Sequence, residues 1–373
     1  MSTVKIKQIT AVVVFLALIC LPCPLSHIVG GPSDEYVEQI ENRTLTKKPV
    51  FSFGNMMAYP KKFEAYFNDH LPFRLPLVQT CSEIEYYIFH TPINNRVIVG
   101  KDGWLFYSER TDGDSIGCYK GTLLFSREQL ESIAANLVES KKQLNKKDIE
   151  FALFIPPNKE RVYSDKMPDY FGEPAEPNRV GQLVEYLRNH TDLTVIYPYE
   201  TLMDARSKTP QLDVYWQTDT HWNELGAYIG ARELLKPFGI ALSAYDESSV
   251  KIKKSQKTVS GDLESYLFLV GKIDSGKDFT IKGLDGHNYI KDEWDFDTIY
   301  RSHSDNGDPR KLFVLRDSFF DSMADSIGPQ FQNSVMVYHR YYKNEMVDKE
   351  NPDIFVYEIA ERYLNELLDF NYK

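Results

Sequence analysis

The sequence predicts an α/β fold in which a mostly parallel β-sheet carries helices on both faces. Short apolar segments typical of buried strands recur along the chain, at 149–157, 193–198, 311–315, 334–339 and 353–359. Segments with helical periodicity lie between several of them. This alternation is typical of parallel strands joined by helical crossovers, and antiparallel sheets rarely produce it.

The predicted helices begin at recognisable capping residues. Ser126 precedes an amphipathic segment that runs to about Lys147, and Gln129 stands three residues later, where a capping box requires it. Residues 178–190 have the same periodicity. Asn223 precedes a further helix, in which small residues alternate with an apolar face.

Three segments depart from the alternating pattern. Residues 61–89 are helical in composition but are interrupted by "LPFRLP", and residues 96–107 contain two strand-like runs around Asp102 and Gly103, a strong hairpin signal. Residues 250–308 are rich in Lys, Gly and Asp, so we expect an insertion that contains β-hairpins.

The N-terminus resembles an export signal. Lys5 and Lys7 precede an uncharged run from Ile9 to Leu25, which is the order of a basic n-region and an apolar h-region. The run is at the short end of the ~17–25 residues that cross a bilayer. We expect residues 1–28 to form a signal anchor, with a cleaved signal peptide as the alternative. Residues 29–54 would be a polar linker, and residues 55–373 the functional domain outside the cytoplasm.

Composition excludes some classes of function. The formal net charge of -11 argues against nucleic-acid binding, which needs clustered Lys and Arg. Beyond the apolar run only Cys81 and Cys118 remain, and their spacing matches no zinc motif. They could pair in an oxidising compartment or stay as free thiols.

A candidate nucleophile follows the strand at 311–315. Ligands of open α/β sheets bind at the carboxyl ends of the strands, and Ser318 lies at such an end, where a helix begins. Unpaired backbone N–H groups at a helix start can hold an oxyanion. The alternative is that Ser318, or its neighbour Asp317, only caps the helix.

A candidate base and acid precede the helix that begins at Asn223. Asp219 and His221 are two residues apart and are bracketed by Trp216 and Trp222. Histidine is the usual base for a serine nucleophile, and a carboxylate on its other ring nitrogen fixes its tautomer. Ser318, His221 and Asp219 are therefore the predicted triad of an acyl-transfer site, although a lone histidine here could be structural.

Other site candidates depend on weaker patterns. Asn158 and Lys159 follow the strand at 149–157, where an amide could help to hold an oxyanion and an amine could steer an acidic polymer; both could also be ordinary loop residues. A metal site made of Asp219, His221 and His339 lacks the HxH or HExxH spacing of known sites. We therefore expect no metal and no cofactor.

The sequence is similar to the alginate O-acetyltransferase AlgX/AlgJ family. The similarity is carried by "TDTHWNELGAYIGARELL", "VLRDSFFDSM", "NNRVIVGKDGWLFY" and "FNDHLPFR", and it extends over residues 55–367. It implies an SGNH hydrolase-like, flavodoxin-like domain in which the Asp-x-His block precedes the serine block. Asp219, His221 and Ser318 match the family's catalytic acid, base and nucleophile.

The resemblance also implies a function and partners. Such proteins move acetyl groups onto hydroxyls of an exopolysaccharide outside the cytoplasm, beside a membrane-bound O-acyltransferase that supplies the acetyl group. The chain ends soon after the catalytic domain, without a carbohydrate-binding module, so it is closer to the anchored AlgJ type. The alternatives are an esterase with the same triad and a catalytically inert glycan-binding or scaffold protein.

One position departs from the hydrolase pattern. Arg316 stands where the serine block usually has the glycine of Gly-Asp-Ser. Its guanidinium group could bind an anionic sugar, or it could pair with a neighbouring acid.

Overall fold

The computed structural model describes residues 3–41, 43–245, 248, 250–254, 261–273, 277–281 and 289–372. The chain divides into two compact units. The first comprises Met1–Asn94 and Glu264–Lys272, and the second comprises Asn95–Leu263 and Ile273–Lys373. The predicted functional domain, residues 55–373, spans parts of both.

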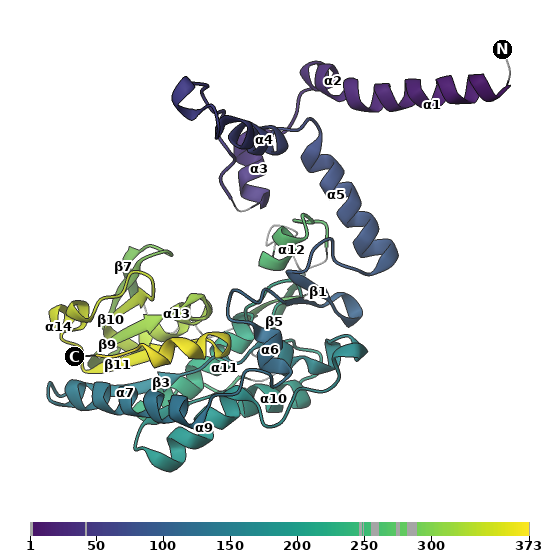
Figure 1. The fold of residues 1–373 in the computed structure, drawn as a ribbon. Helices are drawn as coiled ribbons and strands as arrows, with labels where there is room; N and C mark the ends of the chain where they lie inside the picture. Colours follow the sequence, from purple (N-terminus) through teal and green to yellow (C-terminus); the bar gives the residue numbers. More distant parts are fainter. Residues whose placement is uncertain are drawn as a thin grey trace. The chain divides into compact units, whose positions relative to one another are not determined.

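The second unit is built on a seven-stranded sheet in the order β4-β3-β11-β9-β10-β8-β7. The first five strands in this order are parallel, and β8 and β7 add antiparallel pairs at one edge. The strands are β3 (Glu150–Phe154), β4 (Thr194–Ile196), β7 (Tyr289–Trp294), β8 (Ile299–Ser304), β9 (Asp308–Arg316), β10 (Phe331–Tyr338) and β11 (Ile354–Glu358). The predicted mostly parallel sheet is confirmed (Figure 1).

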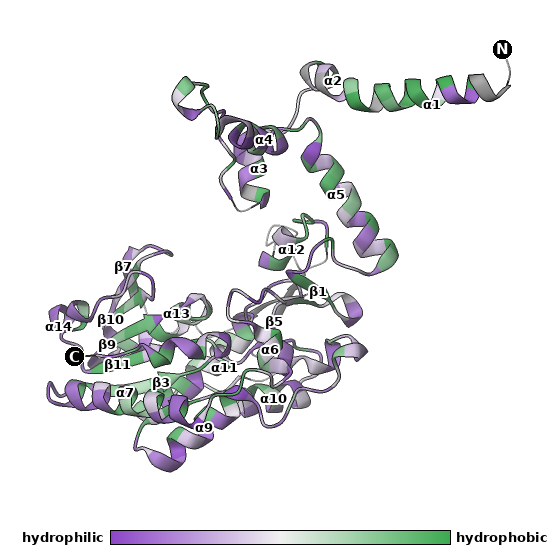
Figure 2. Cartoon of the chain, viewed as in Figure 1, coloured by the Kyte–Doolittle hydropathy of each residue, from purple (hydrophilic) through white to green (hydrophobic). Residues whose placement is uncertain are grey.

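Helices cover both faces of this sheet, as predicted. Alternate residues of each strand point to opposite faces. Val314 and Val356 join the core beneath α11 (Glu224–Leu235) and α13 (Asp321–Ile327). Phe313 and Phe355 join the core beneath α7 (Arg127–Asn145) and α9 (Arg179–His190). Figure 2 shows hydrophobic residues on the central strands and a mixture of hydrophobic and hydrophilic residues on α7.

Local capping explains where the predicted helices begin. The Ser126 side chain accepts from the Gln129 N–H and the Gln129 side chain accepts from the Ser126 N–H, so the capping box of α7 is present. Asn178 caps α9 and Asn223 caps α11 through their side-chain oxygens. The remaining α-helices of this unit are α6 (Ser115–Tyr119), α8 (Lys159–Val162), α10 (Tyr199–Lys208) and α14 (Asn344–Glu350).

The predicted hairpins are present, and one of them extends the main sheet. β1 (Val97–Val99) pairs with β2 (Leu105–Tyr107), and β5 (Val250–Lys254) pairs with β6 (Lys277–Ile281), both antiparallel. β7 pairs with β8, and β8 pairs with β10, so this hairpin extends the main sheet. The sequence did not indicate that the hairpin would join the sheet, because most of β7 is polar and exposed. A short helix, α12 (Asp262–Tyr266), begins in the same insertion, and the rest of that insertion lies outside the described residues.

The first unit is helical. It contains α1 (Thr3–Cys20), α2 (Pro22–Val29), α3 (Asp34–Glu41), α4 (Tyr59–Asp69) and α5 (Arg74–Ile84), and α5 continues into a π-helical turn at Glu85–Phe89. The predicted linker, residues 29–54, contains α3, whose Val37 and Ile40 are buried with Leu45 and Leu75. Arg43, just after the end of α3, forms an ion pair with Asp69 at 2.7 Å and so connects this part of the chain to α4.

Two sequence-based expectations concern membranes and cysteines. In the part of the chain that the structure describes, no helix combines the length and the apolarity needed to cross a membrane. The signal anchor expected over residues 1–28 is not supported by this finding. Cys81 and Cys118 are both free thiols in the structure, which is the second of the two alternatives.

Candidate active site

Ser318 lies two residues after the end of β9, at the start of a short 3-10 helix, Ser318–Phe320, that leads into α13. The preceding residue, Asp317, caps this turn: its Oδ1 accepts from the Phe319 N–H at 2.8 Å. Its Oδ2 accepts from the Ala360 N–H at 2.8 Å, just beyond β11. Because Asp317 takes the capping role, the partly exposed Ser318 hydroxyl remains available for another partner.

That partner is His221. The Ser318 Oγ lies 2.8 Å from His221 Nε2 although the residues are 97 positions apart in the chain. The buried Trp222 helps to bring them together, since its Nε1 donates to the Phe319 carbonyl at 2.9 Å. The Trp216 N–H donates to the His221 carbonyl at 3.2 Å, which closes the turn that carries the imidazole.

Asp219 completes the series from the other side of the ring. Its Oδ1 accepts from His221 Nδ1 at 2.7 Å and from the His221 backbone N–H at 2.9 Å. An ionised carboxylate only accepts hydrogen bonds, so Nδ1 carries the proton and Nε2 is left to accept from the Ser318 hydroxyl. The three predicted triad residues therefore form one hydrogen-bonded series at the carboxyl end of the sheet.

Electrostatics favour this protonation pattern. Burial lowers the pKa of His221, but the Asp219 carboxylate raises it by more, so that the net pKa is above the ordinary value. Burial raises the pKa of Asp219, and the attraction and hydrogen bond of His221 outweigh this and lower it to about 2. Asp219 thus stays ionised and stabilises the imidazolium that forms when His221 takes a proton.

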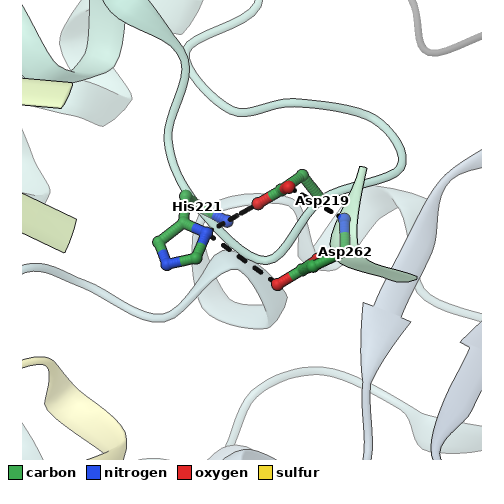
Figure 3. Close-up of side chains that lie close together, drawn as sticks. All are labelled: Asp219, His221 and Asp262. Atoms are coloured by element: carbon green, nitrogen blue, oxygen red, sulfur yellow. Dashed lines mark hydrogen bonds and ion pairs between the residues drawn. The ribbon is translucent and has the colours of Figure 1, made fainter. Parts of the chain in front are cut away.

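A second carboxylate, which the sequence did not single out, braces the same turn (Figure 3). The Asp262 N–H donates to Asp219 Oδ2 at 2.9 Å. The Asp262 carboxylate accepts from the Thr220 N–H at 2.8 Å and from the Thr220 hydroxyl at 2.6 Å. Burial and the neighbouring Asp219 raise the pKa of Asp262 to about 6. The only sequence signal was an ordinary one, an acid at the start of a short helix.

Asp219, His221 and Asp262 could also offer ligand atoms to a metal ion, since one atom from each lies within 4.8 Å of the others. Both Asp219 oxygens already accept hydrogen bonds from His221 and from the Asp262 N–H. This pattern fits a braced carboxylate better than a cation site. His339, the third ligand considered from the sequence, instead faces Glu366 at 3.6 Å.

Lys159 lies inside the protein. Its side chain is buried, and Nζ donates to the carbonyls of Leu105, Gln217 and Asp219 at 2.7, 2.9 and 2.8 Å. This placement does not support the expected contact with an acidic polymer. Nothing in the sequence indicated this burial, because the acceptors are backbone atoms of two distant segments.

Asn158 and Arg316 are buried as well. The Asn158 N–H donates to Glu361 Oε2 at 2.9 Å, and within the described part of the chain its buried side-chain amide makes no hydrogen bond. Arg316 donates to Asp321 Oδ1 at 2.7 Å and to the Phe296 carbonyl at 2.9 Å, and its guanidinium stacks on Tyr300. Of the two roles considered for Arg316, pairing with a neighbouring acid is the one that the geometry supports.

The arrangement is suited to covalent acyl transfer. A hydroxyl, an imidazole and a carboxylate are aligned so that the proton of Ser318 passes to His221 as the oxygen becomes a nucleophile. The Ser318 N–H is at the first position of its helical turn, where no intrahelical acceptor exists. A developing oxyanion could use that donor.

Comparison with known proteins gives the site a context. Residues 97–275 match a family model described as "SGNH hydrolase-like domain, acetyltransferase AlgX". This range includes Asp219 and His221 and ends before Ser318.

Curated relatives cover more of the chain. "Probable alginate O-acetylase AlgJ" of Pseudomonas syringae pv. tomato is 22% identical over 340 residues, which are 84% of this chain and 81% of that protein. Its namesake from Pseudomonas aeruginosa is 26% identical over 207 residues, 55% of this chain and 49% of the relative. The chain therefore spans about half the length of this second relative.

Among solved structures, Bacillus cereus PatB1 is similar in fold. It superposes with a TM-score of 0.55 at 15% sequence identity, over 74% of this chain and 100% of that one. At this identity the likeness concerns the fold alone.

Proposed function

We propose that this chain, which is similar to AlgX and AlgJ proteins and matches an SGNH hydrolase-like domain, is a polysaccharide O-acetyltransferase acting outside the cytoplasm. The family model is described as an acetyltransferase and the relatives as alginate O-acetylases, and both descriptions support this reaction. An alginate-like polymer is accordingly the first acceptor to test.

Ser318 Oγ attacks the acetyl carbonyl of the donor while His221 Nε2 takes the hydroxyl proton. The oxyanion forms beside the Ser318 N–H, and Asp219 stabilises the imidazolium. The bond from the carbonyl carbon to the donor breaks, the leaving oxygen receives the proton from His221, and acetyl-Ser318 remains.

The second step repeats the first in reverse. A polysaccharide hydroxyl gives its proton to His221 and attacks acetyl-Ser318. The ester bond to Ser318 breaks, and the proton returns from His221 to the serine oxygen. In both steps, all groups that catalyse the reaction are side chains and backbone groups of this chain.

One observation carries the proposal, the unbroken series from Asp219 through His221 to Ser318, with contacts of 2.7 and 2.8 Å. A helix-capping serine would not need an imidazole at its hydroxyl. Here Asp317 is the cap.

Ser318→Ala tests this assignment. If Ser318 is the nucleophile, the variant should keep its melting temperature while acetylation of the polymer falls by orders of magnitude. If Ser318 were only a cap, the variant should lose ~0.5–2 kcal/mol of stability and keep its activity per folded molecule. Ser322→Ala is a matched control, because Ser322 is exposed and lies one helical turn further on in α13.

The same assay separates transfer from hydrolysis and from an inert role. Purified protein is given an acetyl donor with and without glycan, and both polymer-bound acetyl and free acetate are measured. Acetate release that is unaffected by glycan would indicate an esterase. A wild-type protein that forms neither product but binds glycan would indicate the scaffold alternative.

The place of action is part of the proposal. Lys5 and Lys7 before the uncharged run Ile9–Leu25 support export, with residues 1–28 as the signal, 29–54 as a connecting segment and 55–373 outside the cytoplasm. A membrane-bound O-acyltransferase would supply the acetyl group. Protease added to intact spheroplasts should digest the protein, and a fully protected product would contradict export.

A further inference from the structure

We propose that Lys159 is a positioning residue for the acid of the triad, acting on the backbone of Asp219 and not on substrate. The inference rests on the proposed function, since it assigns a role within the same site. Lys159 holds the turn that carries Asp219 and His221 in the position where both align with Ser318.

The contacts of Lys159 converge on that turn. Two of its three acceptors, the Gln217 and Asp219 carbonyls, belong to the segment just ahead of His221, at 2.9 and 2.8 Å from Nζ. The third, the Leu105 carbonyl at 2.7 Å, lies on β2. The Leu105 N–H in turn donates to the Gln217 carbonyl at 3.0 Å, so Lys159 closes a small ring between β2 and the turn.

The geometry suits an ammonium group. Three N–H groups meet three carbonyl oxygens, and Nζ lies 5.0 and 5.3 Å from the ring centroids of Trp104 and Phe106. Burial lowers the pKa of Lys159 to about 7, although the nearby carboxylate of Asp219 opposes this. A neutral amine has only two N–H groups and would leave one carbonyl without a donor.

The turn needs such support because the triad acid is held by a short tether. Asp219 must present one oxygen to both the backbone and the ring of His221, only two residues away, and the other to Asp262. Residues 217–220 belong to no helix or strand whose hydrogen bonds could fix them. Lys159 is the side chain that holds the Asp219 backbone itself.

Lys159→Met tests the role, since Met keeps the length and the apolar stem and removes the donors. We expect the rate of Ser318 acylation to fall by about 10- to 100-fold, the cost of misplacing a catalytic group by about 1 Å, with little change in KM for the donor. Because Asp219 would hold the imidazole less well, the acid limb of the pH–rate profile should also move to lower pH. A lysine with only a structural role would lower stability and leave that limb in place.

Lys166→Met is the matched control. Lys166 is also a lysine of the segment that follows β3, but it binds Asp102 at 2.6 Å through a partly exposed ion pair. Its variant should keep both the rate and the pH profile. A similar loss in both variants would mean that the effect comes from removed charge, which would overturn the proposal.

A second variant covers the case in which Lys159→Met does not fold. Lys159→Ala leaves room for a small amine, so n-propylamine should restore part of the rate and return the acid limb, while n-propanol should not. Absence of this amine-specific rescue in folded Lys159→Ala, or a wild-type rate in either variant, would overturn the proposal. If neither variant folds even with the amine, Lys159 is a determinant of folding and the positioning role is wrong.

Sulfonylation of wild-type Ser318 by a serine-reactive sulfonyl fluoride, with loss of fluoride, is read by mass spectrometry and separates this inference from the proposed function. Unlabelled wild-type Ser318 would refute the proposed function. Labelled wild type together with equally fast labelling of Lys159→Met would refute only the role of Lys159.

Discussion

At the scale of single residues, the proposed mechanism makes activity depend on the protonation of His221. The imidazole must be neutral to take the proton of Ser318. Burial alone would keep it neutral at low pH, but the hydrogen bond to Asp219 and the charge of that carboxylate raise its pKa. The carboxylate that stabilises the imidazolium therefore also makes the site easier to inactivate with acid.

This balance predicts the pH dependence of acyl-enzyme formation. A base with a raised pKa is protonated over a wider range, so activity should fall as the pH drops through a value above the ordinary ~6.5 of histidine. In Asp219→Asn the charge is lost, so the acid limb should move to lower pH while the maximal rate falls by orders of magnitude. Stopped-flow measurement of Ser318 acylation from pH 5 to 9 reads both quantities. A wild-type limb clearly below ~6.5 would contradict the role given to Asp219.

At the scale of elements, the triad depends on a turn that three separate elements brace. Residues 216–222 lie between strands and helices, and they are held by Lys159 from α8, by Asp262 from the start of α12 and by Trp222 against the Ser318 turn. Buried polar contacts of this kind fix geometry more than they add stability.

Gly261 shows how tightly one of these elements is fitted. A Cβ at this position would come within 2.1 Å of the Thr218 carbonyl oxygen and 2.4 Å of its carbon, both backbone atoms. Gly261→Ala should therefore push the start of α12 away from the turn and lengthen the contact between the Asp262 N–H and Asp219. We expect a loss of about 1–3 kcal/mol in stability and about 10-fold or more in acylation rate.

Gly54→Ala is the control for that substitution, since its added Cβ would have no neighbour within 4 Å. Thermal melting and acylation should both match the wild type in the control. A Gly261→Ala protein with wild-type acylation would mean that the brace from α12 is dispensable.

The same elements show what the sequence could and could not predict. The helices α7, α9 and α11 were predictable because Ser126, Asn178 and Asn223 cap them through residues three positions away. The convergence of Asp219, His221 and Ser318 was predictable because each residue lies beside a strand end or a helix start. Lys159 and Asp262 were missed or misassigned because their partners are 60 and 43 residues distant, and nothing local encodes those contacts.

At the scale of the whole molecule, the second unit contains every group of the proposed mechanism. Asp219, His221, Ser318, Lys159 and Asp262 all fall within Asn95–Leu263 and Ile273–Lys373. The chain as a whole carries 54 acidic and 43 basic residues, a formal net charge of -11. The two cations that the sequence offered for an acidic polymer, Lys159 and Arg316, are both buried and occupied.

An acidic protein should repel the acidic polymer proposed as its acceptor, and this predicts an unusual dependence on salt. Raising the ionic strength from ~0.01 M to ~0.15 M shortens the Debye length from ~30 Å to ~8 Å and so screens the repulsion. We expect kcat/KM for a polyuronate acceptor to rise several-fold over this range through a lower KM, because screening speeds encounter and leaves the chemistry unchanged. A neutral glycan and the acylation step without acceptor should be nearly insensitive to salt, and they serve as controls.

A fall in kcat/KM for the polyuronate would instead reveal a local cationic binding surface that outweighs the net charge of -11. Substituting exposed lysines and arginines that follow β10, such as Arg340 and Lys343, would then test for that surface.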